Sequence, residues 1–81
     1  MKNKQIKLAS NVKKGPFSGE CVFSFKTSDG STYESIAASS HCDEVNNEID
    51  AYLVKEDENA TYVSVPDGEI LSVDKQIIRE L

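Results

Sequence analysis

The chain has 81 residues and a formal net charge of −5. This length allows one domain with one small hydrophobic core, and a deep substrate cavity would compete with that core for the same apolar side chains. No apolar run follows the basic start, and no stretch reaches the roughly 20 apolar residues that a membrane helix needs. We therefore expect a soluble cytoplasmic protein with no signal peptide and no membrane contact.

The charge is distributed unevenly along the chain. Residues 1–14 contain five lysines and no acid, whereas residues 15–81 contain all 14 acids and only four basic residues. Such a basic arm could bind an anionic partner, or it could fold back on its own acidic body. We expect the second arrangement because it needs no partner. Residues 1–81 then form a single domain, in which the arm 1–14 is either flexible or the first strand.

The first predicted element is a strand over residues 5–9. Ile6 and Leu8 alternate there with polar neighbours, which is the pattern of a strand with one buried face. The sequence KKGPFSGE then breaks the alternation with two glycines and a proline. This break predicts a turn or loop that carries Phe17.

The clearest hairpin follows this loop. Cys21, Phe23 and Phe25 share one face at a period of two, which is typical of a half-buried strand. Ser-Asp-Gly at 28–30 supplies the turn, because Asp and Gly tolerate the backbone angles of tight hairpins. The return strand over 32–37 alternates as well, but its sequence leaves the core-facing side undecided.

Residues 43–55 fit two different structures. As a helix, the segment places Val45, Ile49, Tyr52 and Leu53 on one stripe. As a strand, it alternates from Ile49 onward, and the two asparagines before it favour a loop. We expect a strand over 49–55, and an α+β fold with one helix near 43–55 remains the alternative.

The C-terminal third predicts another hairpin and a short closing strand. The hairpin turns at Pro-Asp-Gly, residues 66–68, and a tight turn at 74–76 precedes alternation from Ile77. Successive hairpins imply an all-β fold, a small antiparallel meander or barrel of five to six short strands. The order of these hairpins resembles the SH3-like and Sm-like small barrels.

The segment SSHCDE, residues 39–44, places the only histidine beside a cysteine. Cys21, His41 and Cys42 offer at most three zinc ligands, and adjacent residues of an extended chain point to opposite sides. A reactive thiol needs an electropositive setting, whereas two acids follow Cys42. We expect a loop without a metal, a cofactor or a catalytic group. Both cysteines should be thiols in a reducing cytosol, with Cys21 buried as a small apolar residue.

Acidic residues accumulate between positions 43 and 58, where one lysine opposes them. Such a surface can imitate a nucleic-acid backbone and bind a basic protein. A solvated face that keeps the protein soluble is the simpler interpretation, and we favour it. The acids are Asp43, Glu44, Glu48, Asp50, Glu56, Asp57 and Glu58.

The sequence favours a non-catalytic small β-barrel interaction module. A meander leaves two strand edges, which are satisfied by a protein partner or by a second copy in a homo-oligomer. An acidic inhibitor or nucleic-acid mimic is the alternative. Nucleic-acid binding through the lysine arm ranks third, because the arm carries no aromatic residue for stacking. Aromatic residues are enriched in interface cores, so the candidate partner contacts are Phe17, Tyr33, Tyr52 and Tyr62.

Overall fold

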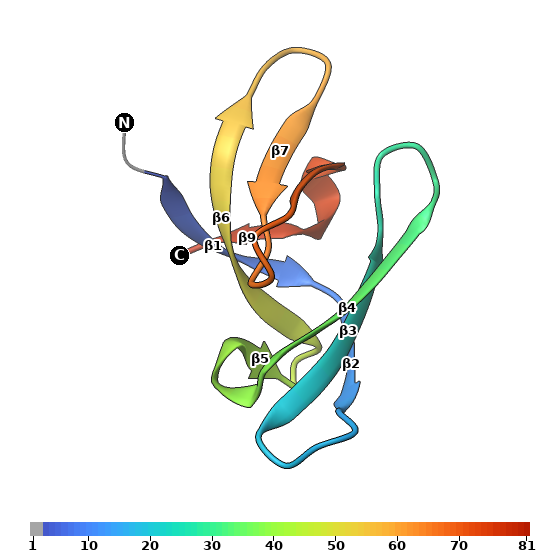
Figure 1. Ribbon diagram of the computed structural model, residues 1–81. Coiled ribbons are helices and arrows are strands. Elements are labelled where there is room, and N and C mark those ends of the chain that lie inside the picture. The colour runs from blue at the N-terminus through green and yellow to red at the C-terminus, as the bar shows by residue number, and fades with distance from the viewer. Residues whose placement is uncertain (1–2) are drawn as a thin grey trace.

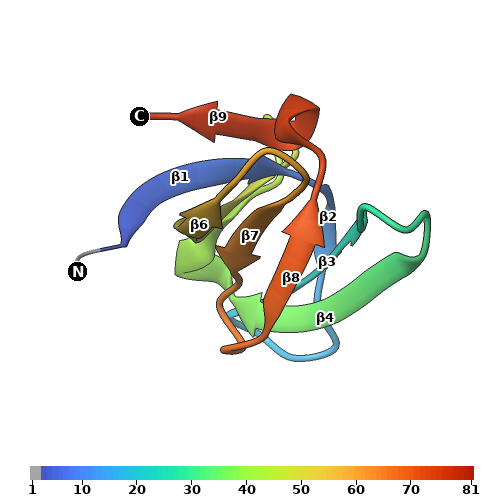
Figure 2. The same cartoon turned by 90° about the horizontal axis from the view of Figure 1, so that it is seen from above.

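A computed structural model describes residues 3–81 as nine short strands and two 3₁₀ turns in two antiparallel sheets (Figures 1 and 2). Lys2, one of the five lysines of the N-terminal arm, lies outside the described residues. The strands are β1 (Lys4–Ala9), β2 (Asn11–Lys14), β3 (Glu20–Lys26), β4 (Thr32–Ala38), β5 (Cys42–Asp43), β6 (Glu48–Glu56), β7 (Thr61–Ser64), β8 (Ile70–Val73) and β9 (Ile78–Glu80). The 3₁₀ turns are η1 (Ser39–His41) and η2 (Lys75–Ile77).

One continuous segment belongs to both sheets. β1 lies in the large sheet, which has the order β8-β7-β6-β1-β9 with β5 paired to β6, and β2 lies in the small sheet, β2-β3-β4. The change of sheet occurs at Ser10, which is buried and donates its backbone N–H to the carbonyl of Asn47 at 2.9 Å. Asn47 adopts a left-handed backbone (φ 54°), and its side-chain oxygen accepts the N–H of Val12 at 3.3 Å. These two residues fix the corner between the sheets.

The hydrophobic core lies between the two sheets and is built from alternate residues of their strands. The rings of Phe23 and Phe25 stack with their centroids 6.2 Å apart, and Phe23 is fully buried. Burying apolar area in this way is the main term that holds a domain of this size together. The buried apolar residues are Ile6, Leu8, Val12, Cys21, Phe23, Phe25, Ala37, Ile49, Ala51, Val63, Val65 and Val73.

The predicted antiparallel meander is confirmed, together with its hairpin turns. Gly30 and Gly68 occupy the turns with φ of 90° and 96°, a region that glycine enters without steric cost. The segment 43–55 is a strand from Glu48 onward, so the alternative helix is not formed. The reason is that Ile49 and Ala51 fill the core at a period of two, which a helix would not allow.

Two expectations about the strands are corrected. The segment Asn11–Lys14 forms a strand of its own, although the predicted turn or loop KKGPFSGE included its two lysines. The sheets also do not close into a barrel. Among residues 3–81, β4 pairs with β3 alone and β8 pairs with β7 alone, so these two strands do not join to close a barrel. The two sheets are linked near the tip of the β3–β4 hairpin, where the N–H of Ser28 donates to the carbonyl of Ser72 at 2.8 Å.

The two helical turns described between residues 3 and 81 are each only three residues long, and neither could cross a membrane.

Candidate functional site

The structure does not gather the four aromatic candidates into one patch, because Phe17 lies in the β2–β3 loop and Tyr33 on β4, whereas Tyr52 and Tyr62 lie on the neighbouring strands β6 and β7. Phe17 is 72% exposed in the loop between β2 and β3, and Tyr52 is 48% exposed on the outer face of β6. Tyr62 is half-buried on β7, opposite Lys55 of β6. These positions leave Phe17 and Tyr52 as the two available for contact.

Tyr33 belongs largely to the core. Its ring packs against Phe23 and Phe25 with centroids 6.3 and 5.7 Å apart, and its hydroxyl donates to the carboxylate of Asp67. Burial, and then this hydrogen bond, raise the pKa of the Tyr33 hydroxyl. The contact with Asp67 ties the small sheet to the β7–β8 turn, so Tyr33 stabilises the packing of the two sheets.

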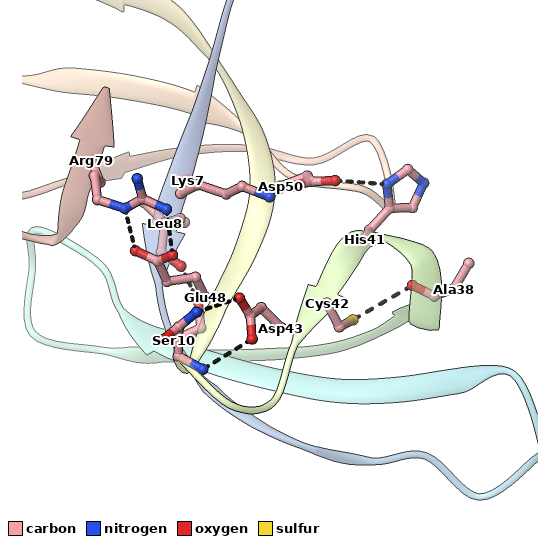
Figure 3. A network of polar contacts seen from close by, with 11 residues as sticks. Lys7, Leu8, Ser10, Ala38, His41, Cys42, Asp43, Glu48, Asp50 and Arg79 are labelled. Carbon is pink, nitrogen blue, oxygen red and sulfur yellow. Dashed lines mark hydrogen bonds and ion pairs between the residues drawn. The ribbon is translucent and has the colours of Figure 1, made fainter. Parts of the chain in front are cut away.

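SSHCDE forms the 3₁₀ turn η1 and the two-residue strand β5, not an open loop. The His41 side chain is half-exposed, and its Nδ1 lies 3.5 Å from Oδ2 of Asp50 (Figure 3). Asp50 also pairs with the Lys7 ammonium group from the neighbouring strand β1. His41 is therefore part of a polar network at the surface, and the neighbouring Cys42 offers it no thiol to activate because its sulfur is in a disulfide.

The expectation of two free thiols is wrong, because Cys21 and Cys42 form a disulfide. Their Cα atoms are 6.6 Å apart, within the range that the bond requires. The two cysteines are 21 residues apart in the sequence and lie on different sheets, Cys21 on β3 of the small sheet and Cys42 on β5 of the large sheet. Only the packing of one sheet against the other brings them together, so no local pattern in the sequence indicated the bond. The sulfur of Cys42 lies 3.5 Å from the carbonyl of Ala38, but it carries no proton to donate in the disulfide form.

Metal chemistry gains no support from the described part of the chain. Within residues 3–81 no group of three or more His, Cys, Asp or Glu side chains is placed to hold a metal ion. Sulfur atoms joined in a disulfide are also no longer the thiolates that zinc binds.

The predicted acidic surface is largely compensated by cations of the same chain. Arg79 donates to both carboxylate oxygens of Glu48 at 2.8 Å, a bidentate pair that joins β9 to β6 (Figure 3). The hydrogen bonds from Arg79 hold the pKa of Glu48 below its usual value. Four of the seven acids make ion pairs: Glu48 with Arg79, Asp50 with Lys7, Glu56 with Lys75 and Asp57 with Lys55.

Asp43 and Asp57 also serve the local backbone. The backbone N–H and then the side-chain amide of Asn46 donate to Asp43 and lower its pKa. The N–H groups of Asn59 and Ala60 do the same for Asp57 in the β6–β7 turn. These carboxylates shape turns and are not arranged as a regular row of charges.

Two lysines of the N-terminal arm pair with carboxylates of the acidic body. Lys4 pairs with Glu80 at 2.6 Å, and Lys7 pairs with Asp50. Both lysines lie on β1, which has a neighbouring strand on each side in the large sheet, β6 and β9. Their positive charge is therefore engaged within the molecule.

Two of the surface hollows in the described part of the chain lie beside exposed candidate residues. The larger, of about 760 Å³, runs beside the disulfide between the loop carrying Phe17 and the turn carrying Val45, which is 90% exposed. Lys14 and Glu44 both line it, so the charge of the lining favours neither an anionic nor a cationic ligand. The smaller, of about 360 Å³, lies beside Tyr52. Sequence analysis placed Val45 only on the apolar stripe of the alternative helix; because that helix is not formed, Val45 instead lies exposed in a turn.

The edge of β4 is the most distinctive feature that the sequence did not locate. The structure turns Tyr33 and Ala37 toward the core, which settles the side that the alternation left open. Glu34 and Ile36 consequently face outward, and Ile36 is 45% exposed. Figure 1 shows β4 along the outside of the small sheet.

The direction of the β4 backbone groups follows from the two ends of the hairpin. Thr27 donates its N–H to the carbonyl of Ser31 and Ser39 donates to that of Gly19, each at 2.8 Å and in the same register as the β3–β4 ladder. Antiparallel residues alternate between bonding to the partner strand and pointing away from it. The N–H and C=O groups of Thr32, Glu34 and Ile36 therefore point to the free edge.

No family model matches the chain, and no curated protein or solved structure is significantly similar to it.

Proposed function

We propose that this chain is a non-catalytic interaction module that binds an extended segment of a protein at the edge of β4. The observation that carries the proposal is a strand of seven residues whose outer backbone groups have no partner within residues 3–81. Unpaired N–H and C=O groups in a row are a template for another strand, and adding one satisfies them all.

β4 also lacks the features that normally protect an edge. Proteins discourage edge pairing with charges, prolines, bulges or very short strands. β4 carries one charge, Glu34, over seven residues and contains no proline. Its ladder to β3 is regular from end to end. The other edges are protected: β2 ends in two lysines, β9 carries an arginine and a glutamate, and β8 has four residues.

The ion pairs described above argue against the alternative that this chain is an acidic inhibitor or nucleic-acid mimic. A mimic must present uncompensated charge to a basic groove. Glu48 and Asp50 have side chains only 13% and 21% exposed and are paired with cations of this chain. Nucleic-acid binding by the lysine arm is disfavoured for the same reason, since Lys4 and Lys7 already have carboxylate partners.

The disulfide bears on the compartment in which such a module works. Disulfides persist in oxidising compartments and are rare in the cytoplasm. A protein with the Cys21–Cys42 bond is accordingly better suited to an oxidising compartment than to the cytoplasm expected from the sequence.

Binding of a peptide that favours an extended conformation tests the proposed function. The probe is a fluorescein-labelled peptide of alternating threonine and valine, and fluorescence anisotropy reports its binding. Ile36→Pro removes an outward N–H without breaking a bond to β3, since edge strands tolerate proline where the N–H faces solvent. Ile36→Thr keeps the N–H and is the matched control.

We expect saturable binding that Ile36→Pro abolishes and Ile36→Thr retains. Equal binding by the wild-type protein and a correctly folded Ile36→Pro variant would exclude the β4 edge as the contact.

A further inference from the structure

The geometry of β4 points to a second copy of this chain as its partner, paired strand to strand about a two-fold axis at Ser35. This inference rests on the proposed function, because it names the protein that supplies the added strand. Two copies would join their small sheets into one continuous sheet with β4 against β4 at its centre.

The hydrogen-bonding pattern limits the registers that two β4 strands can adopt. In an antiparallel pair, residues whose backbone groups point to the partner must lie opposite each other. The outward-pointing groups of β4 belong to its even-numbered residues, so even positions must face even positions. The two-fold axis can pass through Glu34, Ser35 or Ile36, and at each of these three positions most of the strand remains paired.

Charge and strand length select one of these three. A centre at Glu34 sets the two Glu34 carboxylates directly opposite each other, which is destabilising. A centre at Ile36 carries Thr32 of the second copy beyond Ala38 and onto the turn η1, where the strand has ended. A centre at Ser35 pairs the whole of β4, with Glu34 opposite Ile36 of the second copy and Thr32 opposite Ala38.

The side chains fit the same register. Ile36 lies on the outer face beside Val22 of β3, its partner in the ladder, and it is 45% exposed in one copy. In the Ser35-centred pair, the two Ile36 side chains are diagonal neighbours across the axis, close enough for apolar side chains to touch. On the core-facing side, Ser35 lies opposite Ser35, and Ala37 lies opposite Tyr33.

Sedimentation velocity over a series of protein concentrations tests the association. The wild-type protein should pass from 8.9 kDa to twice that mass as the concentration rises. Ile36→Pro should stay monomeric with an unchanged circular dichroism spectrum, and Ile36→Thr should still associate. Ile70→Thr is the control for loss of an exposed isoleucine, because Ile70 is 55% exposed on the large sheet.

Cysteine cross-linking tests the register, with oxidised glutathione as the two-electron oxidant. Two protein thiols are oxidised to one disulfide, and one oxidised glutathione takes up the two electrons and two protons to become two molecules of reduced glutathione. Opposite residues in this pair have Cα atoms about 5.5 Å apart, within disulfide range. A mixture of Glu34→Cys and Ile36→Cys chains should give a covalent heterodimer on a non-reducing gel. Preferential homodimers of Glu34→Cys or of Ile36→Cys would instead place the axis at that residue and overturn the register.

The two levels of the proposal fail in different ways. A wild-type protein that stays monomeric at every concentration but binds the threonine–valine peptide through Ile36 overturns self-pairing and leaves the strand-binding function standing. A monomer that also fails to bind the peptide overturns both. Association that Ile36→Pro does not weaken, in a variant that is still folded, places the contact elsewhere and also overturns self-pairing at β4.

Discussion

Reduction of the Cys21–Cys42 disulfide should destabilise this protein strongly. The bond closes a loop with a sequence separation of 21 residues and joins β3 of the small sheet to β5 of the large sheet. A cross-link restricts the unfolded chain, and the loop-entropy relation gives about 3 kcal/mol for a loop of this length. Domains of this size have a total stability of about 4–12 kcal/mol, so the loss is a large fraction of it.

The expected effect on melting is correspondingly large. At about 4–8 °C for each kcal/mol in a small domain, reduction should lower the melting temperature by about 12–25 °C. Differential scanning calorimetry with and without a phosphine reductant measures this change. Titration of thiols in denaturant establishes whether the bond is intact before treatment and fully reduced after it.

A variant without cysteines provides the control. Cys21→Ala combined with Cys42→Ala removes the cross-link permanently, so its melting temperature should lie near that of the reduced protein and should not respond to the reductant. The reasoning would be refuted if the wild-type protein melted at the same temperature with two titratable thiols as with none.

Three further substitutions test the packing and the ion pairs. Arg79→Gln removes the hydrogen bonds that lower the pKa of Glu48. A lowered carboxyl pKa contributes its full stability above the ordinary value of 4.5 and loses it as the pH falls through the lowered value, so the melting deficit of this variant should be present at neutral pH and shrink as the pH falls below 4.5. A deficit of constant size from neutral pH to about pH 3 would contradict this assignment. Gly15→Ala places a Cβ atom 2.9 Å from the carbonyl carbon and Cβ of Glu20, so urea unfolding should show a loss of about 1–3 kcal/mol, and an unchanged midpoint would show that the loop shifts freely. Phe23→Ala empties the centre of the core and should cost about 3–5 kcal/mol in the same assay, whereas a loss below about 1 kcal/mol would mean that the site collapses around the smaller side chain.

Local alternation determined most of the strands. Cys21, Phe23 and Phe25 predicted a strand with one buried face, and all three are buried on β3. The hairpin turns followed from glycine and aspartate, because those residues accept backbone angles that others resist. Such features depend on neighbours within a few residues, which is why sequence alone reveals them.

The site depended on contacts between distant segments. Whether Ile36 or Tyr33 faces the core depends on which side of β4 packs against the β7–β8 turn, and the sequence of β4 alternates equally well either way. The open edge of β4 has the same origin, since only the arrangement of the two sheets leaves it without a neighbour.

The sequence determined the all-β meander and its turns, because hydrophobic periodicity and turn residues act through interactions between near neighbours in the chain. The tertiary structure alone decided the disulfide, the bend at Ser10, the unclosed sheets and the free strand edge. Each of these depends on contacts between chain segments that are many residues apart, and the local sequence pattern does not determine such contacts.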